Sequence, residues 1–162
     1  MEVALALGIV AFCLVTLIGL LPVAMTSNRN AIQQTAVNNI AKAIVADLKS
    51  TPSTFGSTKA TPGTSPLFKF IIPAVGQAAT SGSSAPTVYF AAAGNAGLLD
   101  ANATASSVYR ATLFFTPPAA GVRAATIARI LITWPAQADP DPNKLPTTYT
   151  GSYETIISLD RN

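Results

Sequence analysis

Hydrophobic and polar residues are distributed very unevenly along this chain. Residues 3–25 are almost wholly apolar, and no charged residue stands between Glu2 and Arg29. About 20 apolar residues in a helix span the hydrocarbon core of a bilayer, so this run is long enough to cross a membrane. A cleaved secretory signal peptide is the competing interpretation, but such peptides have a basic start and a shorter apolar stretch. The acidic start and the length therefore favour a helix that is retained.

The apolar run is followed by a helical pattern that is hydrophobic on one face only. Apolar residues recur at steps of four from position 32 to position 48, with further apolar residues beside them. We therefore predict one long helix over residues 3–49, with an amphipathic second half. Pro22 lacks a backbone donor and crowds the preceding turn, which predicts a kink or a locally melted stretch there. The predicted apolar face consists of Ile32, Ala36, Val37, Ile40, Ala41, Ile44, Val45 and Leu48.

The rest of the chain shows short strand patterns separated by turn residues. Residues 50–66 are rich in Ser, Thr, Pro and Gly, which predicts a loop. Later strands end at prolines or at runs of Gly, Ala, Asn and Asp, and two strong strands joined by one turn suggest an antiparallel meander. The predicted strands are residues 67–72, 87–91, 107–116, 124–134 and 152–159.

These elements predict an α+β fold with a long N-terminal helix and a small antiparallel sheet. One face of the sheet needs cover, and the amphipathic half of the helix can supply it. Residues 1–28 are then the apolar part of the helix, residues 29–50 its amphipathic half, and residues 51–162 a β-rich C-terminal domain. We expect Tyr109, Phe114, Phe115 and Trp134 to be core residues.

Composition excludes several kinds of chemistry. The chain has no His and a single Cys, so it contains no Ser-His-Asp or Cys-His nucleophile, no His metal ligand, no haem-attachment motif and no internal disulfide. Only 10% of its residues are charged, against about 25% in average soluble proteins. The net charge of +3 is small and dispersed, which argues against nucleic-acid binding. We expect no enzymatic activity and no cofactor.

Glu2 is unusual because it stands alone at the start of the apolar helix. In one interpretation it lies in the headgroup layer, close to the positive end of the helix dipole. In the other it pairs with a cation supplied by another subunit, because a lone carboxylate in hydrocarbon is costly. Position in the sequence does not decide between the two.

The segment EVALALGIVAFCLVTLIGLLPV resembles the amino-terminal segment of type IV pilins and of the pseudopilins of type II secretion. Members of that family have an early acidic residue, an apolar helix, a proline near position 22 and an amphipathic extension that carries a small sheet. The resemblance covers about residues 1–50. It implies a pilin-like fold, with Pro22 as the helix-breaking position and Glu2 neutralising the terminal amine of Met1 in a neighbouring subunit.

The family also has a short basic leader, and its acid lies several residues inside the mature chain. Here Met1 directly precedes Glu2. We expect either a start altered by processing or start-site choice, or a divergent mature form.

Three weaker site patterns remain. Asp139, Asp141 and Asn143 space three oxygen ligands two residues apart, like the start of a calcium loop, but the Gly and the closing acid are missing. A solvated polar loop is the alternative. Asn102 begins a tripeptide that fits N-glycosylation, a pattern that also arises by chance. Cys13 is expected to be a small, buried apolar side chain within the membrane segment.

Three functions remain open at this point. The first is a structural subunit of an extracellular helical filament, which would start in the inner membrane and assemble with copies of itself by means of pilus or secretion machinery. The second is a minor pseudopilin or tip subunit of such a machine. The third is a single-pass membrane protein with an extracytoplasmic binding domain.

Overall fold

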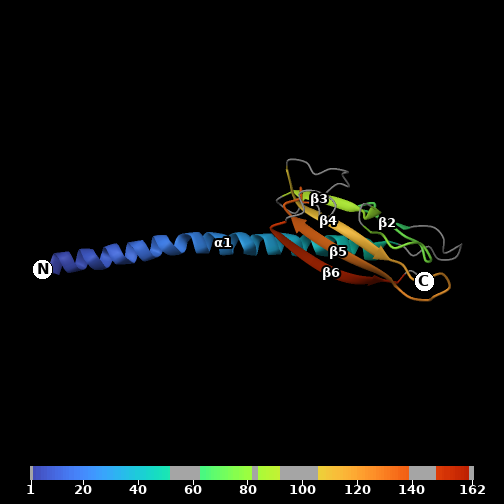
Figure 1. Cartoon of the computed structure of the whole chain (residues 1–162), viewed down its shortest axis with the longest axis horizontal. Coiled ribbons are helices and arrows are strands. Elements are labelled where there is room, and N and C mark those ends of the chain that lie inside the picture. The colour runs from blue at the N-terminus through green and yellow to red at the C-terminus, as the bar shows by residue number, and fades with distance from the viewer. Residues whose placement is uncertain (1, 52–62, 82–83, 92–105, 139–148, 161–162) are drawn as a thin grey trace. The chain divides into compact units, whose positions relative to one another are not determined.

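The computed structural model describes residues 2–51, 63–81, 84–91, 106–138 and 149–160. It consists of one helix, α1 (Glu2–Ser50), and six short or medium strands (Figure 1). The chain divides into two compact units, Met1–Thr35 and Ala36–Asn162, and α1 contributes residues to both. The coarse prediction of one long N-terminal helix plus a small antiparallel sheet is confirmed.

Helix α1 is continuous through Pro22. The expected local melting is therefore wrong. A proline removes one backbone donor, and the hydrogen bonds of the neighbouring turns maintain the helix around that single gap. Gly8 and Gly19 also lie within the unbroken helix.

The larger sheet is an antiparallel meander in the order β3-β4-β5-β6, as the strand patterns predicted. Its strands are β3 (Thr87–Ala91), β4 (Ser107–Thr116), β5 (Thr126–Trp134) and β6 (Gly151–Leu159). Two of these match the predicted bounds, whereas β5 begins two residues later and β6 one residue earlier than predicted. Each strand is rich in β-branched and aromatic residues, which favour the pleated conformation.

The predicted strand over residues 67–72 is largely wrong. Only Ile71–Ile72 (β2) is extended, and it pairs with Gly63–Thr64 (β1), a strand that the sequence pattern did not reveal. Residues 66–68 form a turn, and Lys69 has a positive φ of 57°. Phe68 and Phe70 are nevertheless buried. The apolar pattern thus identified core residues but not their backbone conformation.

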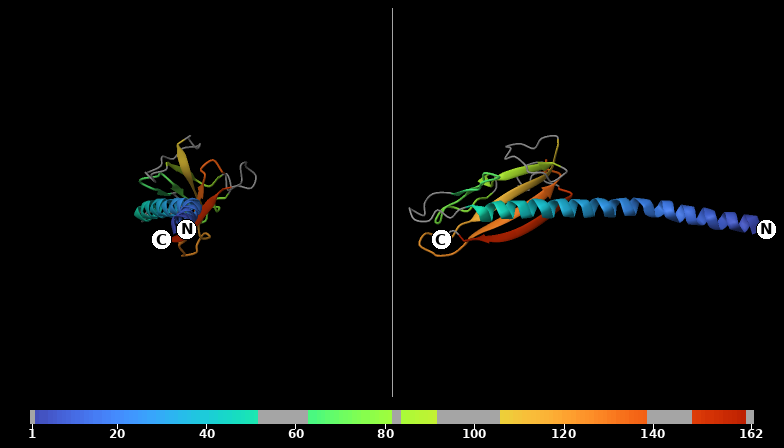
Figure 2. Two further views of the ribbon diagram at one scale, coloured as in Figure 1. Left: turned by 90° about the vertical axis from the view of Figure 1, so that its left-hand side faces the viewer. Right: turned by 180° about the vertical axis from the view of Figure 1, so that it is seen from behind.

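The core of the second unit lies between one face of the meander and the last turns of α1 (Figure 2). Alternate residues of β4 point into it, as predicted, and Ile130 and Ile132 of β5 join them. The helix contributes its face from Val37 onward, whereas Ile32 is 59% exposed and lies outside the core. Of the predicted apolar face, Ile32 therefore does not contribute to this core. The residues of α1 in the core are Val37, Ile40, Ala41, Ile44 and Leu48.

The segment before β3 forms hydrogen bonds with the end of β4 that β3 does not reach. The backbone N–H of Thr80 donates to the carbonyl of Phe115 at 2.9 Å, and the N–H of Phe115 donates to the Thr80 hydroxyl at 2.7 Å. Farther along, Gly76 donates to the carbonyl of Pro118 at 2.9 Å. This loop, predicted only as Gly- and Ala-rich, therefore covers a strand edge.

Aromatic residues lie on both faces of the meander. Phe115 and Tyr109 are buried, and Trp134 packs against the core with its ring 6.2 Å from that of Tyr109. Phe114 points to the opposite face, where the guanidinium of Arg129 lies 4.8 Å from its ring centre. The expectation that Phe114 is a core residue is therefore wrong, because adjacent strand residues face opposite sides.

Candidate assembly surface

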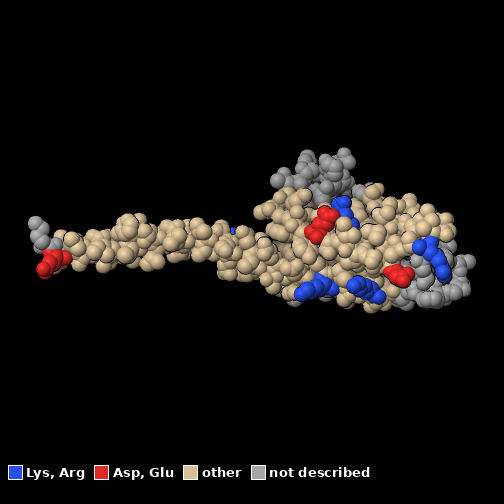
Figure 3. Space-filling model, turned by 90° about the horizontal axis from the view of Figure 1, so that it is seen from below, with Lys and Arg blue, Asp and Glu red and all other residues tan. Residues whose placement is uncertain are grey.

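The first unit presents a helix surface that is both apolar and exposed. Every residue of α1 from Glu2 to Ala31 is exposed. The large apolar side chains along it are 54–75% exposed, from Val3 at 75% to Leu14 at 54%. Figure 3 shows this length of the chain as a largely uncharged surface. Water is an unfavourable environment for so much apolar surface, so the helix needs lipid or protein around it.

By length and composition, α1 is able to cross a membrane. It is the one helix of this kind in the described part of the chain, and none of its most apolar stretch is buried within the molecule. A buried core helix of a soluble protein would contact its own sheet along its length, and residues 3–25 make no such contribution to the core. Membrane insertion is therefore compatible with this surface.

The threonine hydroxyls of the exposed helix are satisfied locally. The Thr16 hydroxyl donates to the carbonyl of Cys13 at 2.8 Å, and that of Thr35 to the carbonyl of Ala31 at 2.9 Å. The Thr26 hydroxyl lies within hydrogen-bond distance of the carbonyls of Pro22 and Val23, at 3.0 and 2.9 Å. Such bonds to carbonyls three or four residues earlier let hydroxyl groups enter an apolar environment without an unsatisfied donor. Sequence reasoning missed this role of the threonines.

Glu2 and Arg29 are the charged residues of the apolar helix, and both are exposed. Among the described residues, no ion pair joins either side chain to another group. Glu2 lies in the first turn of α1, where the N–H groups of the helix end favour an anion. Arg29 lies near the other end of the uncharged stretch. Any charged partner for either residue must therefore come from outside the described part of the chain.

The other predicted site residues lie in parts of the chain that the structure does not describe. Met1, Asn102, Asp139, Asp141 and Asn143 all fall outside the described residues. The described ranges contain no cluster of three His, Cys, Asp or Glu side chains able to hold a metal ion. Cys13 is described, and its side chain is free and exposed on α1. Glu2 and Pro22, the predicted assembly residues that the structure describes, both lie in α1.

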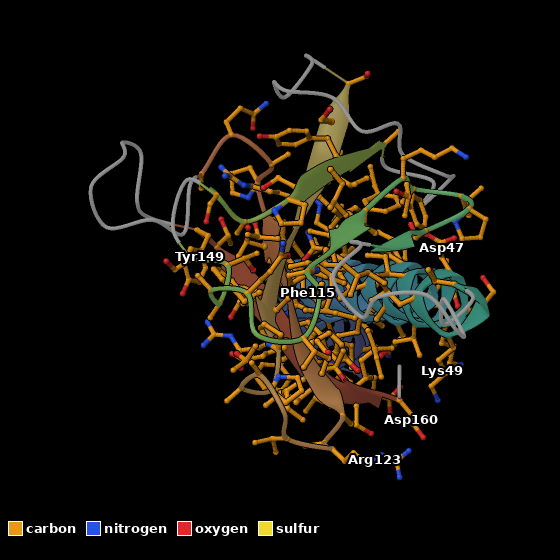
Figure 4. The ribbon with its side chains drawn as sticks, turned by 90° about the vertical axis from the view of Figure 1, so that its right-hand side faces the viewer. Asp47, Lys49, Phe115, Arg123, Tyr149 and Asp160 are labelled. Carbon is orange, nitrogen blue, oxygen red and sulfur yellow. The ribbon has the colours of Figure 1, made fainter. Side chains whose placement is uncertain are left out.

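Asp47 attaches the end of α1 to the loop before β2. Asp47 is 4% exposed, and its carboxylate accepts hydrogen bonds from the backbone N–H groups of Leu67 at 2.7 Å and Phe68 at 3.0 Å. Figure 4 shows Asp47 beside the green strands at the end of the helix. Two charge-assisted hydrogen bonds satisfy a carboxylate that would otherwise be costly to bury. This residue is therefore structural.

The second unit has a shallow hollow beside β2, about 680 Å³ in volume. Ile71, Pro73 and Pro86 line it together with Ala78, and Lys69 is the ionisable side chain among its described lining residues. The polar side chains of Gln77, Thr80 and Ser84 also line the hollow.

Arg129 and Glu154 form an exposed ion pair on the outer face of the sheet. Arg129 Nε lies 3.4 Å from Glu154 Oε1, and both side chains are nearly half exposed. Exposed pairs of this kind contribute little to stability.

Burial in the core raises the pKa of Tyr109 above its usual value of 10.0, because desolvation disfavours the phenolate.

Comparison with protein-family models, with curated proteins and with solved structures finds no match to this chain.

Proposed function

We propose that this chain is a structural subunit of a helical filament on the cell surface, with a type IV pilin-like architecture. Residues 2–35 of many copies form the filament core, and the β-rich unit of each copy faces outward. The chain resides in the inner membrane before assembly, and a membrane-bound pilus or secretion machine transfers it into the filament. In this proposal the protein has no enzymatic activity and requires no cofactor.

A single observation supports this proposal most directly. One continuous helix combines an exposed apolar segment, residues 3–25, with a segment whose face from Val37 onward builds the core of a folded unit. The same helix therefore joins a surface that needs neighbours to a unit that has its own core. Copies that associate through the apolar segment necessarily carry the β-rich unit with them.

The hydrophobic effect does not drive the transfer of the apolar helix from the membrane into a filament of identical helices. Lipid tails are as apolar as leucine side chains, so a helix gains no further hydrophobic stabilisation when it leaves the membrane. Close packing and interhelical polar contacts must favour the filament instead. The small residues of α1, among them Ala4, Gly8, Ala11 and Gly19, allow helices to approach closely.

A single-pass membrane protein is the second candidate. The observation that favours it is the same apolar helix, which is able to span a bilayer as a monomer. In that case Glu2 and Arg29, the two ends of the uncharged stretch, remain in the two headgroup layers, and no helix–helix contact forms.

Electron microscopy of material sheared from cells that produce the full chain tests the proposal. Thin uniform fibres in which this chain is the main protein by mass spectrometry support it, with cells lacking the chain as the control. Fibres that contain the chain only in trace amounts instead support the minor pseudopilin or tip subunit. Monomers that appear only after detergent extraction support the single-pass membrane protein.

A further inference from the structure

The charges of the exposed helix form a sparse pattern. Between residues 2 and 41 the sequence contains one acid, Glu2, and one base, Arg29. Both side chains are exposed, and no ion pair within the described ranges involves either of them. The two opposite charges therefore mark the ends of a long uncharged surface.

Helix geometry prevents these two residues from pairing within one molecule. They are 27 residues apart in an unbroken helix, which corresponds to about 40 Å along the axis at 1.5 Å per residue. At 3.6 residues per turn, the same separation is about seven and a half turns, so the two side chains lie on opposite sides of the helix. A contact between Glu2 and Arg29 must therefore join two molecules.

The distance between Glu2 and Arg29 along the helix also matches the thickness of a membrane, where the chain resides before assembly. A bilayer measures roughly 40–45 Å including its headgroup layers, so a helix that spans it places Glu2 and Arg29 in opposite headgroup layers. Both charges are then hydrated. When the helix packs into a protein core, they lose that hydration, and an unpaired charge becomes strongly destabilising.

We propose that in the filament the Glu2 carboxylate of one subunit pairs with the Arg29 guanidinium of a second copy, displaced by about 40 Å along the helix axis. This inference rests on the proposed filament function. Residues on opposite sides of one helix are the arrangement that a head-to-tail contact requires, and head-to-tail contacts produce open filaments. Arginine suits the role because its planar fork binds a carboxylate through two hydrogen bonds.

The sequence next to Arg29 fits this displacement. In the pair, the apolar run of one copy lies beside residues 30–41 of the other, which contain no charge. Ile32 is 59% exposed within that stretch, although its side chain is apolar. A contact with a neighbouring apolar helix removes Ile32 from water. Other copies, displaced by less than about 40 Å along the axis, pack their apolar runs against each other.

The competing partner for Glu2 is the terminal amine of Met1 in a neighbouring copy. That pairing leaves Arg29 without a role in assembly. Charge reversal separates the two arrangements, because only a Glu2–Arg29 pair is restored when both charges are exchanged.

The experiment measures the yield of fibres from the full chain, with membrane-inserted protein measured in parallel. We expect Glu2→Gln and Arg29→Gln each to reduce fibre yield about tenfold or more, since each leaves one buried charge unpaired. We expect the double variant Glu2→Arg/Arg29→Glu to recover fibre yield to within about threefold of the original chain, because the pair is re-formed with its polarity exchanged. The matched control Glu2→Arg/Lys42→Glu exchanges the acid with the next base along the chain and should not recover.

Cysteine cross-linking measures the displacement directly. In a Cys13→Ser background, Glu2→Cys/Arg29→Cys removes both charges and places two thiols at the proposed contact. We expect oxidised fibres of this variant to give a ladder of covalent multimers. The control Glu2→Cys/Ile18→Cys/Arg29→Gln also removes both charges and tests a displacement shorter by about 16 Å at 1.5 Å per residue.

Normal fibres from Arg29→Gln would overturn the Glu2–Arg29 pair while leaving the filament function intact. Loss of fibres in both single variants without recovery in the exchanged double variant would also overturn it. A ladder from the Ile18 control but not from the Arg29 variant would contradict the 40 Å displacement. Absence of fibres from the original chain would instead contradict the proposed function itself, and the pair with it.

Discussion

The carboxylate of Asp47 accepts a hydrogen bond of 2.7 Å from the backbone N–H of Leu67, which lies 20 residues later in the chain. A second N–H, that of Phe68, donates to the other carboxylate oxygen at 3.0 Å. The Phe68 ring that follows is buried among the core aromatic residues. Asp47 therefore fixes where the chain enters the core after the loop.

The first prediction concerns this anchor. Asp47→Ala should lower the free energy of unfolding of the β-rich unit by about 1–3 kcal/mol, because it leaves two backbone donors without their acceptor. Asp47→Asn should cost less, since its amide oxygen still accepts one bond. Chemical denaturation followed by the fluorescence of Trp134, the single tryptophan, measures the effect. Lys49→Ala, at an exposed position of the same turn, is the control, and an equal loss there would contradict the anchor.

The second prediction compares two isoleucines of the same helix. Ile44 is fully buried and Ile32 is 59% exposed. Ile44→Ala should reduce the free energy of unfolding by about 2–5 kcal/mol, because it opens a cavity in the core. Ile32→Ala should change it by no more than about 0.5 kcal/mol, as an exposed substitution does. The same denaturation experiment in detergent tests both. A large loss at Ile32 would show that the core extends farther along the helix than the structure indicates.

The outcome at these positions shows what the sequence was able to predict. The spacing of apolar residues identified the helix face correctly from Val37 to Leu48, and alternation identified the inward side of β4. The position along the helix where burial begins was not predictable, because it depends on where the sheet ends and not on the helix pattern.

The error around Phe68 has a similar origin. Residues 67–72 read as a strand because they are apolar and end at a proline. Their backbone donors are instead taken by Asp47 and by the Ser65 hydroxyl, which accepts from Phe70 at 3.0 Å. Asp47, which accepts two of these hydrogen bonds, lies on the preceding helix, and the local pattern of residues 67–72 does not reveal such a contact.

The candidate assembly residues were partly accessible from the sequence. Glu2, Pro22 and the uncharged run can be identified in the sequence. The structure adds that the side chains of this run are exposed and that the helix is continuous through Pro22. The opposite placement of Glu2 and Arg29 follows only once the helix is known to be continuous between them. The neighbours that would contact this surface belong to other molecules, so neither the sequence nor a single chain displays them.

The third prediction concerns the close approach of Gly151 and Trp134. A Cβ atom at position 151 would overlap the Trp134 ring, so any larger residue must displace that ring from the edge of the core. Gly151→Ala should reduce the free energy of unfolding by about 1–3 kcal/mol, as overpacking does. In a Trp134→Leu background the same substitution should cost much less, because the ring is absent. Circular dichroism during denaturation measures all four variants, and equal losses in the two backgrounds would contradict the proposed clash.

The fourth prediction is an alkaline destabilisation that depends on Tyr109. Burial raises the pKa of Tyr109 above 10.0, so its phenolate forms more readily in the unfolded chain than in the folded one. The unfolded state therefore loses its proton first, and the stabilisation present below pH 10 is lost as the pH rises from about 10 through the higher pKa of the folded state. Unfolding experiments between pH 8 and pH 11 should show a decline that Tyr109→Phe reduces. Tyr149→Phe, at an exposed position, should leave the decline unchanged, and the same slope in all three proteins would contradict the role of Tyr109.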